Sequence, residues 1–90
     1  MYKENEEVVK LAKSIELNKI AISLFTNRAL CYSKKKLEAN VIADTTYVID
    51  NLSKKNVKAY YRRALAYKAF CQYKDALTDL NEILAFEPDN

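Results

Sequence analysis

The most constraining feature of this sequence is that it repeats itself after 35 residues. Shifting the chain by that distance superimposes five identical residues: Arg28 on Arg63, Ala29 on Ala64, Leu30 on Leu65, Tyr32 on Tyr67 and Asp44 on Asp79. Four of the five identities lie within a window of five residues, and the apolar matches around them keep the spacing of an amphipathic helix. A repeat this short is one supersecondary unit, so the sequence predicts an array of units that bury a shared core.

The composition favours helices as the content of each unit. Glycine is absent, proline occurs once in 90 residues, and histidine is absent as well. A chain without glycine has no phosphate-binding glycine loop, no dinucleotide fingerprint and no tight β-hairpin turns. Without histidine it also lacks the usual catalytic base and the commonest metal ligand. We therefore expect an all-α protein that is not an enzyme and that holds no cofactor or metal.

Each unit is predicted to contain a helix, a short break and a second helix. The first unit predicts helices over residues 20–34 and 38–51, and the second carries matching apolar stripes at Val57, Tyr60, Ala64, Tyr67, Ala76, Leu80 and Ile83. Asn18 and Asn56 stand just before helical runs, where short polar side chains cap exposed backbone N–H groups. Pro88 marks the end of the last helix, because the residue before a proline avoids helical geometry.

A further apolar pattern over residues 4–16 precedes the first complete unit. At an offset of 34, three of its residues match the second predicted helix: Val8 with Ile42, Leu11 with Thr45, and Ile15 with Ile49. We expect one domain over residues 1–90 with about five antiparallel helices, divided into half a repeat (1–18) and two whole repeats (19–53 and 54–90). Because about three repeats are usually needed for stability, we expect a fragment of a larger protein, or a unit completed by another copy.

Charged residues are segregated along the chain, although the net charge is only +3. Residues 19–36 and 58–74 each carry five basic residues and no acidic one, whereas residues 75–90 carry five acidic and no basic. So mild a net charge predicts binding neither to nucleic acid nor to a membrane. Cys31 and Cys71 lie in apolar surroundings without ligand or redox spacing, so we expect buried free thiols. Free thiols suit a reducing compartment, and the N-terminus does not resemble a secretion signal. Together they predict a cytoplasmic protein.

The repeat resembles the tetratricopeptide repeat (TPR) family, whose units are two antiparallel helices in about 34 residues. Residues of the second unit at the family's signature positions are Tyr60, Ala64, Tyr67, Ala76, Leu80, Ile83 and Pro88. The first unit matches with Phe25, Ala29, Tyr32, Val41, Thr45 and Val48, and has Ser53 where proline usually stands. The resemblance implies an α-solenoid of helix-turn-helix units. Ala29 and Ala64 would then lie where the two helices of a unit approach most closely, and a larger side chain would push them apart.

Three polar residues on the predicted first helices form the candidate binding site. Lys58 and Arg62 are four residues apart and project from one helix face, and Asn27 occupies the position of Arg62 one repeat earlier. In the TPR family these helices line the concave face of the array. Ammonium, guanidinium and amide donors that converge there would suit a carboxylate.

The runs around these residues, 26–29 and 57–64, resemble co-chaperone TPR domains of the Hop and CHIP type. The resemblance implies a protein-binding module in which Asn27, Lys58 and Arg62 form part of a carboxylate clamp. Its partner would be the acidic C-terminal tail of a heat-shock chaperone of the seventy- or ninety-kilodalton class, or another acidic tail. In that family two more clamp residues come from a first helix without a counterpart in this chain, so we expect the clamp to be partial.

Other interpretations remain open. Lys58 and Arg62 are also compatible with a solvated helix face, and Arg28 and Arg63 are expected to lay their stems along the interhelix surface with their charged heads in water. The run over residues 4–16 resembles the second helix of a repeat, but this chain contains no first helix to pair with it. That leaves a second function open. In that alternative the chain is a structural TPR scaffold for a non-chaperone partner, or a homodimer that exchanges this helix.

Overall fold

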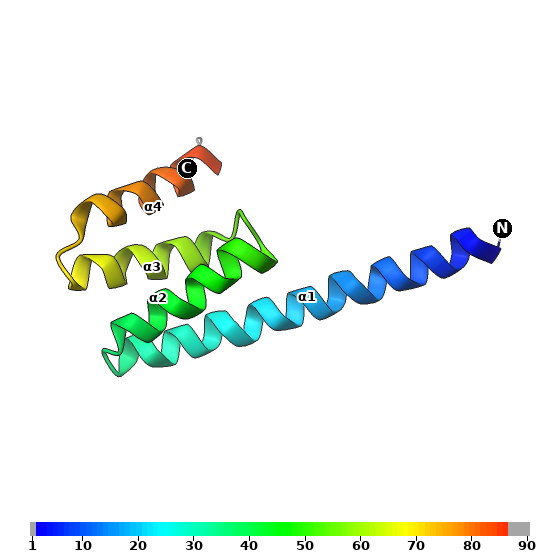
Figure 1. Cartoon of the computed structure of the whole chain (residues 1–90), viewed down its shortest axis with the longest axis horizontal. Coiled ribbons are helices and arrows are strands. Elements are labelled where there is room, and N and C mark those ends of the chain that lie inside the picture. Colours follow the sequence, from blue (N-terminus) through cyan, green and yellow to red (C-terminus); the bar gives the residue numbers. More distant parts are fainter. Residues whose placement is uncertain (1, 87–90) are drawn as a thin grey trace.

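The structure is a computed structural model that describes residues 2–86, and within that range it is helical without strands. Four α-helices follow one another: α1 (Tyr2–Lys34), α2 (Glu38–Tyr47), α3 (Val57–Ala69) and α4 (Tyr73–Phe86), with a π-helical turn, η1 (Val48–Leu52), continuing α2 (Figure 1). Successive helices run antiparallel; α2 packs against α1 and α3, and α4 packs against α3. The predicted all-α, TPR-like fold is confirmed. Pro88 lies outside the described residues.

The prediction of about five helices was wrong, because the runs over residues 4–16 and 20–34 form a single helix. α1 is 33 residues long and passes through Asn18 without a break. No glycine or proline stands between the two runs, so nothing there interrupts the hydrogen-bond ladder. Asn18 therefore caps no helix, and its Nδ2 donates to the carbonyl oxygen of Leu52 at 2.9 Å. The division into a half repeat and two whole repeats stays a prediction.

Both helix pairs turn at a residue in the left-handed region. Lys36 and Cys71 have φ angles of 60° and 61°, although neither is glycine. Beyond each of them a backbone N–H reaches back to a tyrosine carbonyl, from Leu37 to Tyr32 at 2.9 Å and from Gln72 to Tyr67 at 2.8 Å. Glycine usually supplies this helix-ending geometry. Because this chain has none, two larger residues adopt it, at a cost of roughly 1–2 kcal/mol each.

Small buried side chains let the helices approach one another. Ala29 on α1 and Ala64 on α3 are 0% and 2% exposed, as a close approach of the helices there requires. Ala29 packs with Val41 and Ala66, while a second cluster is built from Val48, Ile49, Ala59 and Tyr60. The start of α3 is fixed as predicted, since Oδ1 of Asn56 accepts a hydrogen bond from the N–H of Ala59 at 2.9 Å.

The same ion pair joins the two helices of each pair. Arg28 on α1 donates from Nε and Nη2 to Asp44 on α2 at 2.8 and 2.6 Å. Arg63 on α3 donates in the same way to Asp79 on α4 at 2.8 and 2.7 Å. Both guanidinium groups also lie over two aromatic rings, those of Phe25 and Tyr32 for Arg28 and those of Tyr60 and Tyr67 for Arg63. The expectation that both charged heads lie in water was wrong for Arg63, which is largely buried, whereas Arg28 is half exposed although it too pairs with a buried carboxylate.

The two ion pairs differ in how much water reaches the arginine. The Arg28 side chain is 55% exposed, whereas that of Arg63 is 15% exposed and also bonds to the hydroxyl of Thr46 at 3.1 Å. The hydrogen bond to the carboxylate is the main cause that raises the pKa of each arginine, through Asp44 and Asp79 respectively. Burial raises the pKa of Tyr60, which packs beside the second pair. The α3–α4 pair is thus the drier of the two.

Both cysteines are free thiols, but they are exposed instead of buried. Cys71 occupies the turn before α4, where its left-handed backbone keeps it out of the helix interface. Its Sγ accepts a hydrogen bond from the hydroxyl of Tyr73 at 3.7 Å, and that bond raises the pKa of Tyr73. Cys31 lies on the outer side of α1. Apolar neighbours in the sequence did not predict burial of the cysteines, because successive residues of a helix point in different directions.

We predict that Lys36→Gly stabilises the chain, because glycine adopts the left-handed conformation without strain. The free energy of unfolding should rise by up to about 1 kcal/mol, measured by urea denaturation. Lys35→Gly removes the same charge one residue earlier and is the matched control, which should be neutral or destabilising. Equal effects of the two substitutions would contradict a specific strain at residue 36.

We predict that Asp79→Ala destabilises the chain more than Asp44→Ala. Removing Asp79 leaves the largely buried Arg63 without a counter-charge, which should lower the free energy of unfolding by about 3 kcal/mol. Removing Asp44 leaves Arg28, which can turn into water because it is half exposed. Thermal unfolding followed by circular dichroism compares the two. Equal losses would show that the helix pairs depend equally on their ion pairs.

Candidate functional site

A hollow between α1 and α3 gathers two of the three predicted site residues. Its volume is about 240 Å³, and its lining comes from α1 through Leu30 and Ser33 and from α3 through Lys58, Tyr61, Arg62 and Leu65. These are the first helices of the two repeats, which the sequence placed along the binding face. Lys58 and Arg62 line the hollow together because they are one helical turn apart on α3.

Arg62 carries a donor that has no partner within the described residues. Its Nη1 atom is buried and makes no hydrogen bond to any group between residues 2 and 86. The two ion pairs found in that range belong to Arg28 and Arg63, so no carboxylate neutralises Arg62 or Lys58 there. A buried, unsatisfied guanidinium nitrogen costs free energy, on the order of 1–3 kcal/mol. The hollow therefore has a cationic lining that no described carboxylate neutralises.

Asn27 does not line this hollow. It is exposed on α1, one helical turn before Leu30, which does line it. The structure thus brings Lys58 and Arg62 together and leaves Asn27 at a neighbouring position on the facing helix. Lys58 is exposed and Arg62 is half-buried, so both can be reached from solvent.

The apolar part of the hollow was missed by reasoning from charges. Leu30 and Leu65 occupy equivalent positions in the two repeats, and both line it. Both are partly exposed, as is Tyr61. The identity of Leu30 and Leu65 in the repeat was a usable signal, because equivalent residues on successive first helices face the same groove.

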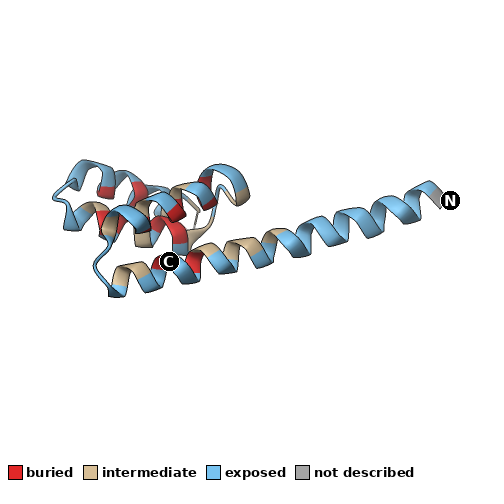
Figure 2. Ribbon diagram, turned by 60° about the horizontal axis from the view of Figure 1, so that its bottom comes forward, coloured by how far each residue is buried: buried red, intermediate tan, exposed pale blue. Residues whose placement is uncertain are grey.

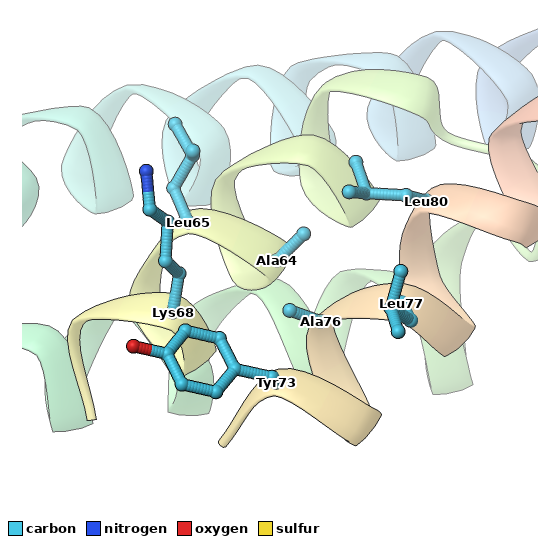
Figure 3. Close-up of a pocket in the computed structure, with 7 residues that line it drawn as sticks. All are labelled: Ala64, Leu65, Lys68, Tyr73, Ala76, Leu77 and Leu80. Atoms are coloured by element: carbon cyan, nitrogen blue, oxygen red, sulfur yellow. The ribbon is translucent and has the colours of Figure 1, made fainter. Parts of the chain in front are cut away.

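Two other hollows differ from this one in chemistry. The first lies between α3 and α4, has a volume of about 310 Å³ and is apolar except for Lys68 at its edge. Figure 3 shows Ala64 and Ala76 between the bulkier Leu65, Tyr73, Leu77 and Leu80. The second, lined by Leu24, Phe25 and Arg28, has a volume of about 430 Å³. Because Arg28 is paired with Asp44, neither offers an unneutralised guanidinium.

Two negative findings apply to residues 2–86. No group of three or more histidine, cysteine, aspartate or glutamate side chains in that range could hold a metal ion. None of the helices described there, α1 included, combines the length and apolarity of a membrane span.

No protein-family model and no solved structure matches the chain. Several curated proteins are similar to it, among them three relatives. Human sperm-associated antigen 1 is 37% identical over 79 residues, which are 88% of this chain and 8% of that protein. Serine/threonine-protein phosphatase T of Aspergillus oryzae is 43% identical over 68 residues, 76% of this chain and 14% of that protein. Rat serine/threonine-protein phosphatase 5 is 32% identical over 89 residues, 98% of this chain and 18% of that protein.

The chain therefore spans less than a fifth of the length of each of these relatives. The similarity covers most of the all-helical array, including the hollow between α1 and α3. The shared part is one segment within proteins that carry different names.

We predict opposite effects on stability for the same substitution at two adjacent arginines. Arg62→Met removes the unsatisfied donor and keeps an apolar stem, so the free energy of unfolding should stay the same or rise by about 1 kcal/mol. Arg63→Met leaves Asp79 buried without its counter-charge and should lower the free energy of unfolding by about 3 kcal/mol. Urea denaturation measures both. A similar loss at Arg62 would identify it as a structural residue.

Proposed function

We propose that this chain is a protein-interaction module of the co-chaperone TPR kind, which binds the C-terminal carboxylate of a partner between α1 and α3. The preferred partner is the acidic tail of a heat-shock chaperone. The observation that carries this proposal is the buried Nη1 of Arg62, which lacks a partner in a hollow that Lys58 also lines. The resemblance of runs 26–29 and 57–64 to clamp domains supports the same ligand chemistry.

A chain-terminal carboxylate fits this hollow better than other anions of similar charge. Arg62 and Lys58 supply cationic donors, and each charge-assisted hydrogen bond is worth about 1.5–3 kcal/mol. Leu30, Leu65 and the ring of Tyr61 supply an apolar wall for the last side chain of a peptide. A volume of about 240 Å³ suits one residue of a peptide and not a folded surface.

Asn27 is proposed as the third donor, acting from α1 on the residue that precedes the terminal carboxylate. It lies outside the hollow on α1, one helical turn from Leu30, which lines it. With three donors, an affinity in the micromolar range corresponds to about −8 kcal/mol, which a few charge-assisted bonds and one apolar contact supply after ordering costs.

The relatives support a binding role for the shared segment. Two of the three are named phosphatases and the third is named an antigen, yet all contain this helical segment as a small part of their length. A segment common to proteins of such different names is more readily explained by binding than by one reaction. Phosphatase activity is therefore not proposed for this chain.

We predict that a short acidic peptide with a free C-terminus binds in the micromolar range, and that its amidated twin binds at least tenfold more weakly. Amidation removes the charge that Lys58 and Arg62 would bind. Isothermal titration calorimetry measures both peptides. The Arg62→Met variant should abolish the difference between them.

The matched control is Lys68→Met, which removes one positive charge from the same helix but from the hollow between α3 and α4. It should preserve the preference for the free carboxylate. Equal binding of the two peptides to the unmodified chain would reject the clamp. Equal weakening by Lys68→Met and Arg62→Met would reduce the interaction to non-specific attraction by a basic surface.

A further inference from the structure

The N-terminal half of α1 carries an uncovered apolar stripe. Every residue from 3 to 17 is exposed, and this half of the helix extends away from the other helices (Figure 1 and Figure 2). Val8, Leu11 and Ile15 are 64%, 61% and 58% exposed. Their spacing of three and four residues places them on one face of the helix. Exposed apolar residues in such a line mark an interaction surface and not a solvated helix.

This stripe continues the face by which α1 packs against its own chain. Ile22 and Phe25 follow it at the same helical spacing, and they pack against the cluster of Val48, Ile49, Ala59 and Tyr60. One helix face therefore begins uncovered and becomes partly buried where it packs on this cluster. Lys10 and Lys13 lie on the opposite side, so the uncovered part is apolar along its centre.

We propose that this chain forms a symmetric dimer in which the N-terminal halves of two α1 helices pack antiparallel through Val8, Leu11 and Ile15. A two-fold axis near Leu11 brings Leu11 of the two copies together and sets Val8 of each helix toward Ile15 of the other. The stripe is its own complement under this symmetry, because it has an apolar residue at its centre and one on either side. It shares no residue with the hollow between α1 and α3, so the dimer does not depend on the proposed function.

Charge complementarity favours a second copy in this orientation. Seven residues separate Leu11 from both Glu4 and Asn18, so the axis places Glu4 of one helix beside Asn18 of the other. Asn18 bonds to the carbonyl of Leu52, which holds the loop over residues 53–56 next to that point. The acidic residues Glu4 and Glu7 of one copy would then face the basic residues Lys19, Lys54 and Lys55 of the other. A parallel pairing would instead set like charges together.

The size of the contact predicts a reversible dimer. Two helical segments of this length bury on the order of 1,000 Å² in total, which is at the low end for specific interfaces. We therefore expect a dissociation constant in the micromolar range, with monomer at low concentration and dimer at high concentration.

The first experiment measures the molar mass of the chain by sedimentation equilibrium between about 1 and 500 µM. The unmodified chain should shift from monomer to dimer, and Leu11→Lys, which sets two charges against each other on the axis, should raise the dissociation constant at least tenfold. Leu17→Lys is the matched control, because Leu17 is a leucine of similar exposure, 66%, about 120° around the helix. It should leave the dimer intact. Circular dichroism verifies that both variants stay helical.

The second experiment tests the orientation by disulfide formation, in a chain whose two exposed thiols are removed by Cys31→Ser and Cys71→Ser. Leu11→Cys should form a cross-linked dimer under mild oxidation, whereas Glu4→Cys and Leu17→Cys should not. Cross-linking at Glu4→Cys would indicate parallel helices, and cross-linking at Leu17→Cys would indicate the opposite face. Either result overturns the proposal. A chain that stays monomeric at all concentrations also overturns it and would mean that the stripe binds a helix of another protein.

Discussion

The structure depends on an arginine–aspartate ion pair that is formed twice, each time with a buried aspartate. In each helix pair the first helix supplies the arginine and the second helix the aspartate, with two hydrogen bonds between them. The bidentate geometry fixes the helices in register, and the alanines at Ala29 and Ala64 let them come close enough for it to form. The aromatic rings on which both guanidinium groups lie complete the same arrangement. The repeat in the sequence is therefore a repeat of this interaction.

The pairing of Arg63 with Asp79 leaves the adjacent Arg62 pointing in another direction. Successive residues on a helix point in directions about 100° apart, so Arg62 faces the groove when Arg63 faces α4. Arg63 is satisfied by Asp79, whereas Nη1 of Arg62 is buried without a partner in the described residues. One arginine thus holds the fold, whereas the adjacent one keeps an unsatisfied donor at some cost in stability and is the residue to which we assign the proposed ligand. The proposed binding site needs no loop and no glycine.

The absence of helix breakers affects both the length of α1 and the turns between helices. Without glycine or proline near Asn18, two predicted helices become the single α1, and half of it extends beyond its partners with its apolar face uncovered. Without glycine at the turns, Lys36 and Cys71 adopt strained backbone angles. The uncovered face of α1 and the apolar hollow between α3 and α4 both lie where a neighbouring helix would complete an array of this kind.

Local pattern determined much of this protein before the helices were packed. The repeat, the apolar spacing and the lack of glycine predicted an all-α array and the cap at Asn56, because these follow from propensity and periodicity, while the resemblance to TPR units implied antiparallel pairing and a close approach at Ala29 and Ala64. The tertiary structure decided what those patterns leave open. It paired Arg28 and Arg63 with aspartates 16 residues away, exposed both cysteines, and separated Asn27 from the hollow that Lys58 and Arg62 line. Spacing along a helix fixes only the direction of a side chain, whereas its partner depends on which residue of another helix stands opposite.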